Sequence, residues 1–224
     1  RYVGEWKENK FHGKGSFKYL NGDTYDGEWK MDKREGKGLY VSNDGEHYDG
    51  EWIGDEKNGF GEMDFSNGDR YVGDWKNGII EGKGKMIFSN GDTFEGKWLK
   101  NRRHGEGTQT FASGEQYIGS WDQGIRSGKG AQIYLNGDNY VGSWKNGNRN
   151  GFGIFTDSKG SVDTFVKDLK NDVRKITTYH LWTDRVCSFF DERGISYLFI
   201  SRPKILTIFF SLLNFIRNNK VSYK

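Results

Sequence analysis

Tyr25-Asp26-Gly27-Glu28-Trp29 is the stretch that decides the fold, because its pattern returns along most of the chain. Six further stretches have an aromatic residue first, a glycine third and a tryptophan fifth. Their tryptophans, with Trp29, are Trp6, Trp29, Trp52, Trp75, Trp98, Trp121 and Trp144. Neighbouring tryptophans are 23 residues apart in every case. A fixed period of this length indicates a repeat protein.

Each repeat predicts two β-strands. In the stretch quoted above, the two rings and the glycine share one face of a strand, and the two acidic residues share the other. A short polar loop leads to a second stretch, residues 36–40, in which we predict that Gly36, Gly38 and Tyr40 share a face. Asn-Gly or a similar pair joins successive repeats, as at residues 21–22, and such pairs are strong hairpin signals.

The glycine pair of the second strand also recurs in every repeat. The pairs are Gly13/Gly15, Gly36/Gly38, Gly59/Gly61, Gly82/Gly84, Gly105/Gly107, Gly128/Gly130 and Gly151/Gly153. Glycine inside a strand costs conformational entropy, so it needs a structural reason. We predict that rings lie flat over the neighbouring strand, where any Cβ would collide with them. No helix follows these pairs, which argues against a phosphate-binding loop.

The predicted fold is an all-β repeat array, a single-layer twisted antiparallel meander of about seven two-stranded repeats. A sheet of about fourteen strands does not stay flat, because each strand pair twists. We therefore expect the sheet to curl into a trough, with the aromatic–glycine face inside and the charged face outside.

The combination of aromatic-x-Gly-x-Trp and Gly-x-Gly at a 23-residue period resembles the MORN (membrane occupation and recognition nexus) repeat family. The resemblance covers seven repeats in residues 1–160. It implies a non-enzymatic scaffold, spacer or docking surface. In members of the family the repeats are joined to kinases or methyltransferases, or occur in junctions, flagella and the cytoskeleton, and phospholipid binding is often assigned to them. A cytoplasmic protein associated with cytoskeleton or membrane is therefore implied.

The repeat pattern ends after Gly160. Asp163 and Lys167 stand where an eighth repeat would place its tyrosine and tryptophan. We predict a degenerate terminal strand in residues 161–169, with Ser161–Val166 at the sheet edge, and a C-terminal tail of mixed or helical structure in residues 170–224. Apolar residues at helical spacing begin the tail at Val173 and Ile176, residues 194–200 predict a short strand, and residues 205–218 predict a capping or interfacial helix. A tail that is not native sequence is a further alternative.

Composition and charge exclude nucleic acid as a partner. The net charge is +3, but residues 161–224 contain eleven Lys and Arg against six Asp and Glu, so the repeats are close to neutral. Affinity for nucleic acid comes mostly from neutralised phosphates, which a neutral array does not supply. The single cysteine, Cys187, allows no disulfide within the chain and gives no argument for an oxidising compartment.

Polar residues are distributed by repeat and do not gather at one site. His12 and His104 occupy the same position four repeats apart, so they do not converge as metal ligands. The carboxylates are spread by repeat, as on a solvated face. No nucleotide-binding or nucleophile motif is present. We predict no enzyme activity, no catalytic residue, no metal and no cofactor in this chain.

Our first functional hypothesis is a scaffold or adaptor that docks a protein partner, a helix or a peptide, in the aromatic–glycine trough. The ring density exceeds what we expect one sheet layer to bury by itself. The residues predicted to contact the partner lie in the central repeats and are Tyr71, Trp75, Phe94, Trp98, Tyr117 and Trp121. A second copy of the chain, in a homodimer, is an alternative partner.

The second hypothesis is a peripheral membrane tether that binds anionic phospholipid through the tail or the repeats. The apolar run at residues 205–216 is shorter than the ~20 residues that span a bilayer. Its basic flanks suit the headgroup region. The residues predicted to contact the membrane are Arg202, Lys204, Ile208, Phe209, Leu212, Arg217 and Lys220. We favour a helix that caps the array end, because repeat arrays need caps.

A third hypothesis follows from the resemblance alone. Because MORN repeats are found joined to enzymes, the array is alternatively the regulatory repeat region of a larger enzyme, such as a phosphatidylinositol phosphate kinase.

Overall fold

The computed structural model describes residues 1–167, 173–176, 186–190 and 196–200. The chain divides into two units, residues 1–174 and 175–224, which are considered one at a time. The helix predicted at residues 205–218 lies outside the described residues, as do all seven residues predicted to contact a membrane.

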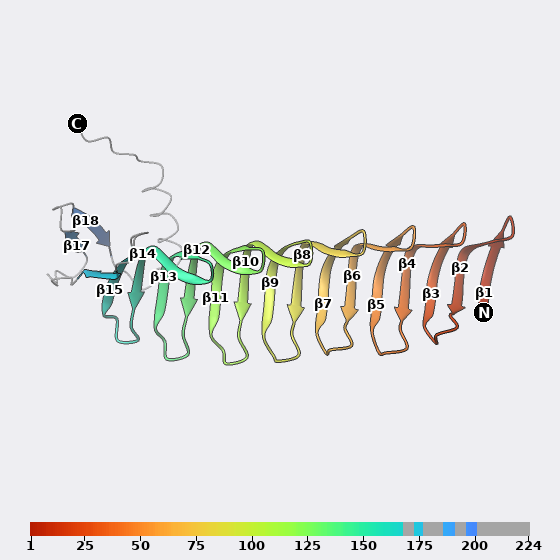
Figure 1. Ribbon diagram of the computed structural model, residues 1–224, viewed down its shortest axis with the longest axis horizontal. Helices are drawn as coiled ribbons and strands as arrows, with labels where there is room; N and C mark the ends of the chain where they lie inside the picture. Colours follow the sequence, from red (N-terminus) through yellow and green to blue (C-terminus); the bar gives the residue numbers. More distant parts are fainter. Residues whose placement is uncertain (168–172, 177–185, 191–195, 201–224) are drawn as a thin grey trace, which may run out of the picture. The chain divides into compact units, whose positions relative to one another are not determined.

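The repeats form one antiparallel sheet whose strands lie side by side in chain order, as Figure 1 shows. The first strands of the seven repeats are β1 (Tyr2–Lys7), β3 (Thr24–Lys30), β5 (His47–Ile53), β7 (Arg70–Lys76), β9 (Thr93–Leu99), β11 (Gln116–Asp122) and β13 (Asn139–Lys145). The second strands are β2 (Lys10–Lys18), β4 (Lys33–Val41), β6 (Glu56–Asp64), β8 (Ile79–Ile87), β10 (Arg102–Thr110), β12 (Ile125–Ile133) and β14 (Asn148–Thr156). The predicted single-layer meander is confirmed.

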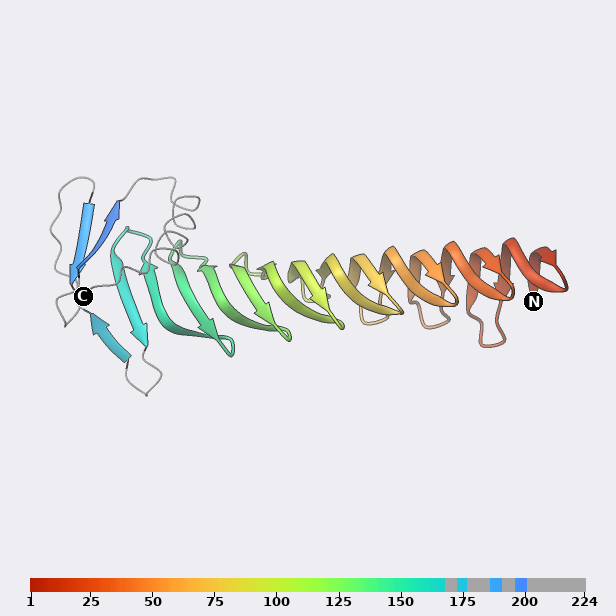
Figure 2. The ribbon, with the colours of Figure 1, turned by 90° about the horizontal axis from the view of Figure 1, so that it is seen from above.

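A fifteenth strand, β15 (Val162–Lys167), pairs with β14 where we predicted a degenerate strand. It is followed in the strand order by β16 (Val173–Ile176), so β15 is not the edge of this sheet. The helical spacing from Val173 to Ile176 was misleading, because both residues are β-branched and suit an extended chain. Figure 2 shows the array from above as a twisted ribbon, as expected for a long sheet.

The second unit contains an antiparallel pair, β17 (Val186–Phe190) and β18 (Ser196–Ile200). The strand predicted at residues 194–200 corresponds to β18. Cys187 lies opposite Phe199 in this pair.

Aromatic rings on one face of the repeat sheet form its core. We call it the aromatic face. The Tyr25 ring meets the edge of Trp29 in its own repeat at 5.0 Å between centroids, and Trp52 of the next repeat at 5.4 Å, with interplanar angles of 87° and 86°. The same pairs continue along the array, so each ring is covered by its neighbours. Edge-to-face pairs contribute about 0.5–1.5 kcal/mol each beyond the buried area.

Each repeat is also joined to the one before it by a tryptophan hydrogen bond. Trp29 Nε1 donates to the Gly15 carbonyl at 2.8 Å, and the five later tryptophans up to Trp144 each donate to a glycine carbonyl fourteen residues earlier, at up to 3.4 Å. Within the repeat, the Tyr25 hydroxyl donates to the Glu28 carbonyl at 3.1 Å. The buried polar atoms of the rings therefore have partners.

The glycine pair has two separate roles. A Cβ on Gly38 would overlap the Tyr25 phenol, which confirms that this glycine makes room for a ring. Gly36 does not share that face, contrary to our prediction. The strand register shifts at this point, Gly36 has a φ of +64°, and its Cβ would lie 2.6 Å from a Glu28 carboxylate oxygen. The irregularity is a β-bulge, which turns Gly36 toward the charged face.

The room that a glycine leaves for a ring can be tested at Gly84. Replacing Gly84 with alanine puts a methyl group into the Tyr71 phenol, so we expect the free energy of unfolding to fall by about 1–3 kcal/mol in chemical denaturation. Gly54→Asn is the control, because its Cβ has open space and Asn77 and Asn146 occupy the same position at φ values of 48° and 51°. Equal losses in both variants would contradict the steric explanation.

Candidate functional site

A cation stands over most of the buried tryptophans on the aromatic face. It comes from one position of the second strand, which we call the cation position. Its residues in chain order are Phe11, Arg34, Lys57, Ile80, Arg103, Arg126 and Arg149. Arg126 lies opposite Trp121 of its own repeat in the strand register, and its guanidinium lies 4.6 Å from the ring of Trp144 in the next. Arg103 lies over Trp121 in the same way, at 4.3 Å. These are cation–π contacts.

Buried glutamines hold two of these arginines in place. Arg103 Nη1 donates to Gln109 Oε1 at 2.7 Å, and Arg126 Nη1 donates to Gln132 Oε1 at 2.8 Å. The glutamines are only 8% and 3% exposed. Arg103 Nη2 also donates to the Gly124 carbonyl at 2.9 Å. With a ring beneath and an amide beside it, each guanidinium has a fixed orientation.

The second repeat differs from the late repeats in how this cation is neutralised. Arg34 Nε lies 3.2 Å from Asp55 Oδ1, a carboxylate of the following turn. The corresponding residue is Gly124 for Arg103 and Gly147 for Arg126. Within the part of the chain that the structure describes, Arg103 and Arg126 therefore have no carboxylate within 4 Å.

This arrangement is electrostatically unfavourable for Arg103. Burial first, and then the charge of Arg126, lower the pKa of Arg103 from its usual value, while Asp92 acts in the opposite direction. Arginine still remains protonated at neutral pH. The late repeats thus hold two oriented positive charges close together, and neither has a carboxylate of the described residues at ion-pair distance.

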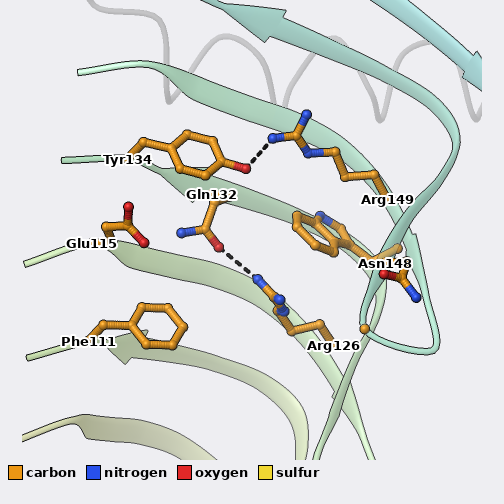
Figure 3. A pocket seen from close by; sticks show the side chains of 9 residues that line it. Phe111, Glu115, Arg126, Gln132, Tyr134, Asn148 and Arg149 are labelled. Carbon is orange, nitrogen blue, oxygen red and sulfur yellow. Dashed lines mark hydrogen bonds between the residues drawn. The ribbon is translucent and has the colours of Figure 1, made fainter. Parts of the chain in front are cut away.

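An open hollow of about 560 Å³ lies over the late repeats. Its lining residues are Phe111, Glu115, Arg126, Gln132, Tyr134, Trp144, Gly147, Asn148 and Arg149. Figure 3 shows Gln132 directed at Arg126 and the Tyr134 hydroxyl directed at Arg149. Phe111 and Glu115 lie on the same side as Tyr134, across from the two arginines. A second hollow of about 340 Å³ shares Glu115, Tyr134 and Arg149 with the first. We refer to the first as the late-repeat hollow.

Glu115 departs from the pattern of its position in the turns between repeats. In other repeats this carboxylate accepts a backbone N–H of the next turn, as Asp92 Oδ1 does from Ala112 and Asp138 Oδ1 from Ser158, both at 2.8 Å. Among the described residues, no hydrogen bond engages the Glu115 carboxylate. It is instead part of the lining of the late-repeat hollow.

The six aromatic residues predicted to bind a partner lie on the aromatic face but are buried. The exposed fractions are zero for Tyr71, Phe94 and Tyr117, and 4–6% for the three tryptophans Trp75, Trp98 and Trp121. The premise that one layer leaves its rings uncovered is therefore wrong, because rings of successive repeats bury one another. These side chains present little surface to a partner in this conformation.

The arginines of the cation position were missed by the sequence analysis. They follow directly after the variable loop of each repeat, and we treated them as part of that loop. The available signal was the recurrence of Arg34, Arg103, Arg126 and Arg149 at multiples of the 23-residue period, six residues before the inward-facing residue that ends the second strand.

His12 and His104, the histidines considered in the sequence analysis, lie apart from one another, on β2 and β10. His104 Nδ1 lies 3.4 Å from Asp122 Oδ1 at the surface. In the described ranges, no three His, Cys, Asp or Glu side chains gather as metal ligands. Those ranges also contain no helix with the length and apolar character needed to cross a membrane.

These features define a single-layer β-repeat protein, and comparison with known proteins identifies its family. The MORN repeat profile matches residues 2–24, 25–47, 48–70, 71–93, 94–116, 117–139 and 140–162. The chain belongs to the MORN repeat family. No curated protein matches it.

Solved structures show only weak likeness. A catalytically inactive virginiamycin B lyase from Staphylococcus aureus with quinupristin is 8% identical, with 91% of this chain and 89% of that chain covered and a TM-score of 0.21. A streptogramin B lyase is 10% identical over 89% and 94% of the two chains, with a TM-score of 0.19. At such scores the likeness carries no argument.

Because Arg103 and Arg126 are half-buried and no described residue forms an ion pair with them, we expect these arginines to add no stability to the fold. This expectation can be tested by placing the apolar pair of another repeat at the position of Arg126 and Gln132. Repeat four has Ile80 and Met86 where repeat six has Arg126 and Gln132. The double substitution Arg126→Ile with Gln132→Met removes a charge without leaving a buried amide unpaired. We expect the free energy of unfolding, measured in urea, to stay within about 0.5 kcal/mol or to rise.

Arg34→Ile is the matched control, because this arginine has its carboxylate partner. Its loss removes the ion pair with Asp55, so we expect a decrease of roughly 0.5–1 kcal/mol. If the double variant of repeat six loses more than Arg34→Ile, the late arginines are structural.

Proposed function

We propose that this MORN array is a non-enzymatic scaffold or adaptor that docks a protein partner, as a helix or peptide, in the late-repeat hollow. The observation that carries the proposal is the late-repeat hollow itself, which combines half-buried rings with oriented charges. Its partner-facing residues are Phe111, Tyr134 and Arg126, and not the buried rings of our first prediction.

The rigidity of the surface supports docking without large rearrangement. Trp144 and Trp121 are held by hydrogen bonds to the preceding repeat, and the arginines lie directly on them. Rings on a rigid frame lose little entropy on binding, which favours affinity. Phe111 and Tyr134 add aromatic surface of the kind that anchors protein interfaces.

The chemistry of the late-repeat hollow favours a protein over the other polymers. The repeats are close to neutral, and Glu115 places a negative charge in the lining, which disfavours a continuous polyanion. A scaffold of this kind would act in the cytoplasm, at the cytoskeleton or at a membrane. Tethering through the tail stays a prediction, since its residues lie outside the described part of the chain.

The proposal is tested by selecting binders from a random peptide library against the full chain. We expect selected peptides to protect backbone amides of β10 to β14 from hydrogen exchange. We also expect the substitution pair Arg126→Ile with Gln132→Met, or Tyr134→Ala, to weaken their binding at least tenfold in fluorescence polarisation.

Arg34→Ile should leave the affinity of these peptides unchanged, because Arg34 lies in the second repeat. Peptides that protect only the early strands, or that bind the substituted chains as tightly as the wild type, would contradict the proposal.

A further inference from the structure

We propose that the late-repeat hollow, together with Arg103 of the preceding repeat, recognises an acidic α-helix, with carboxylates at positions i and i+7 pairing with Arg126 in the hollow and with Arg103 beside it. The inference rests on the proposed docking function and names the chemical class of the partner. It is carried by the missing counter-charges, the orientation of the guanidiniums and their spacing.

A single position of the repeat determines whether the arginine has a carboxylate partner. Asp55 supplies a carboxylate to Arg34, whereas Gly124 and Gly147 stand at that position beside Arg103 and Arg126. The array is therefore able to neutralise this cation internally and does not do so in the late repeats. Half-buried charges without a partner favour an incoming group of opposite sign.

Arg126 presents the edge of its guanidinium that suits a carboxylate. Nη1 donates to Gln132, while no described residue accepts from Nε or Nη2 of Arg126. These two N–H groups lie on one side of the guanidinium, and that side forms parallel hydrogen bonds with the two oxygens of a carboxylate. The tryptophan below and the glutamine beside it fix the orientation of the guanidinium.

The spacing of the arginines selects a helix over an extended peptide. Arg103 and Arg126 stand one repeat apart, which is two strands or ~10 Å. Three residues of an extended peptide cover this distance, but they point the two side chains to opposite faces. In an α-helix, residues i and i+7 are about 10.5 Å apart on the same face. Phe111 and Tyr134, also one repeat apart, offer contacts to apolar residues beside the acids.

The recessed position of Arg126 favours a protein segment over a lipid surface. Arg126 and Gln132 belong to the lining of the late-repeat hollow, alongside Tyr134 and Asn148. A flat bilayer meets protruding residues first, whereas a helix enters a hollow.

The experiment is a double-mutant cycle on the full chain with the peptides selected from the library. Each acidic residue of a selected helix is changed to glutamine, and binding is measured to the wild type and to the Arg126→Ile, Gln132→Met chain. We expect Glu→Gln at i or i+7 to weaken wild-type binding at least tenfold and to have less than a twofold effect on the substituted chain. Moving the second acid from i+7 to i+5 should weaken binding as much as removing it.

Two outcomes would overturn the acidic-helix inference, and both can be distinguished from a failure of the docking proposal. Peptides that protect β10 to β14 but bind equally with glutamine leave docking intact and remove the acidic requirement. The second outcome is measured with vesicles containing phosphatidylinositol bisphosphate. If they bind the wild type, lose binding to the substituted chain and are not displaced by the acidic peptide, the ligand is a lipid headgroup. Failure of docking itself appears as the absence of any footprint on these strands.

Discussion

From Trp29 to Trp144, the indole N–H of the tryptophan in each repeat donates to a glycine carbonyl of the preceding repeat, and the rest of the array depends on this bond. It fixes the ring against the sheet, and the neighbouring tyrosine then covers its edge, as Tyr25 does for Trp52. A single-layer sheet has no second layer to bury its apolar face. Here the rings of successive repeats take the place of that layer, so the core and the proposed docking surface are on the same side of one sheet.

This arrangement explains which positions of the repeat vary in sequence without loss of the core. The ring, the two glycines and the tryptophan are required in every repeat, whereas the cation position lies on top of the core and tolerates Phe11, Ile80 or an arginine. A change at the following turn, from Asp55 to Gly124, then decides whether the arginine is neutralised. In the proposed function, binding specificity comes from the residues stacked on the rings, and not from the rings.

The fold was predictable because its signals are local and repeated. Period, alternation and turn residues all point to a hairpin array, and they need no long-range information. Three features were not predictable by counting residues. Gly36 faces the charged side because a bulge interrupts the alternation. Trp98 and its equivalents are buried because the preceding repeat covers them, as Tyr71 does for Trp98. Arg126 lies over Trp144 because the two residues come from neighbouring strands of successive repeats. Each depends on contacts between repeats.

The most direct test of this account is hydrogen exchange of the indole N–H groups, followed by NMR. Trp6 is 59% exposed and serves as the internal reference, while Trp75, Trp98 and Trp121 are at most 6% exposed and hydrogen-bonded. The account predicts that these three indole protons exchange orders of magnitude more slowly than that of Trp6. Exchange as fast as in Trp6 would show that the rings are open to solvent and available to a partner, which would contradict the account.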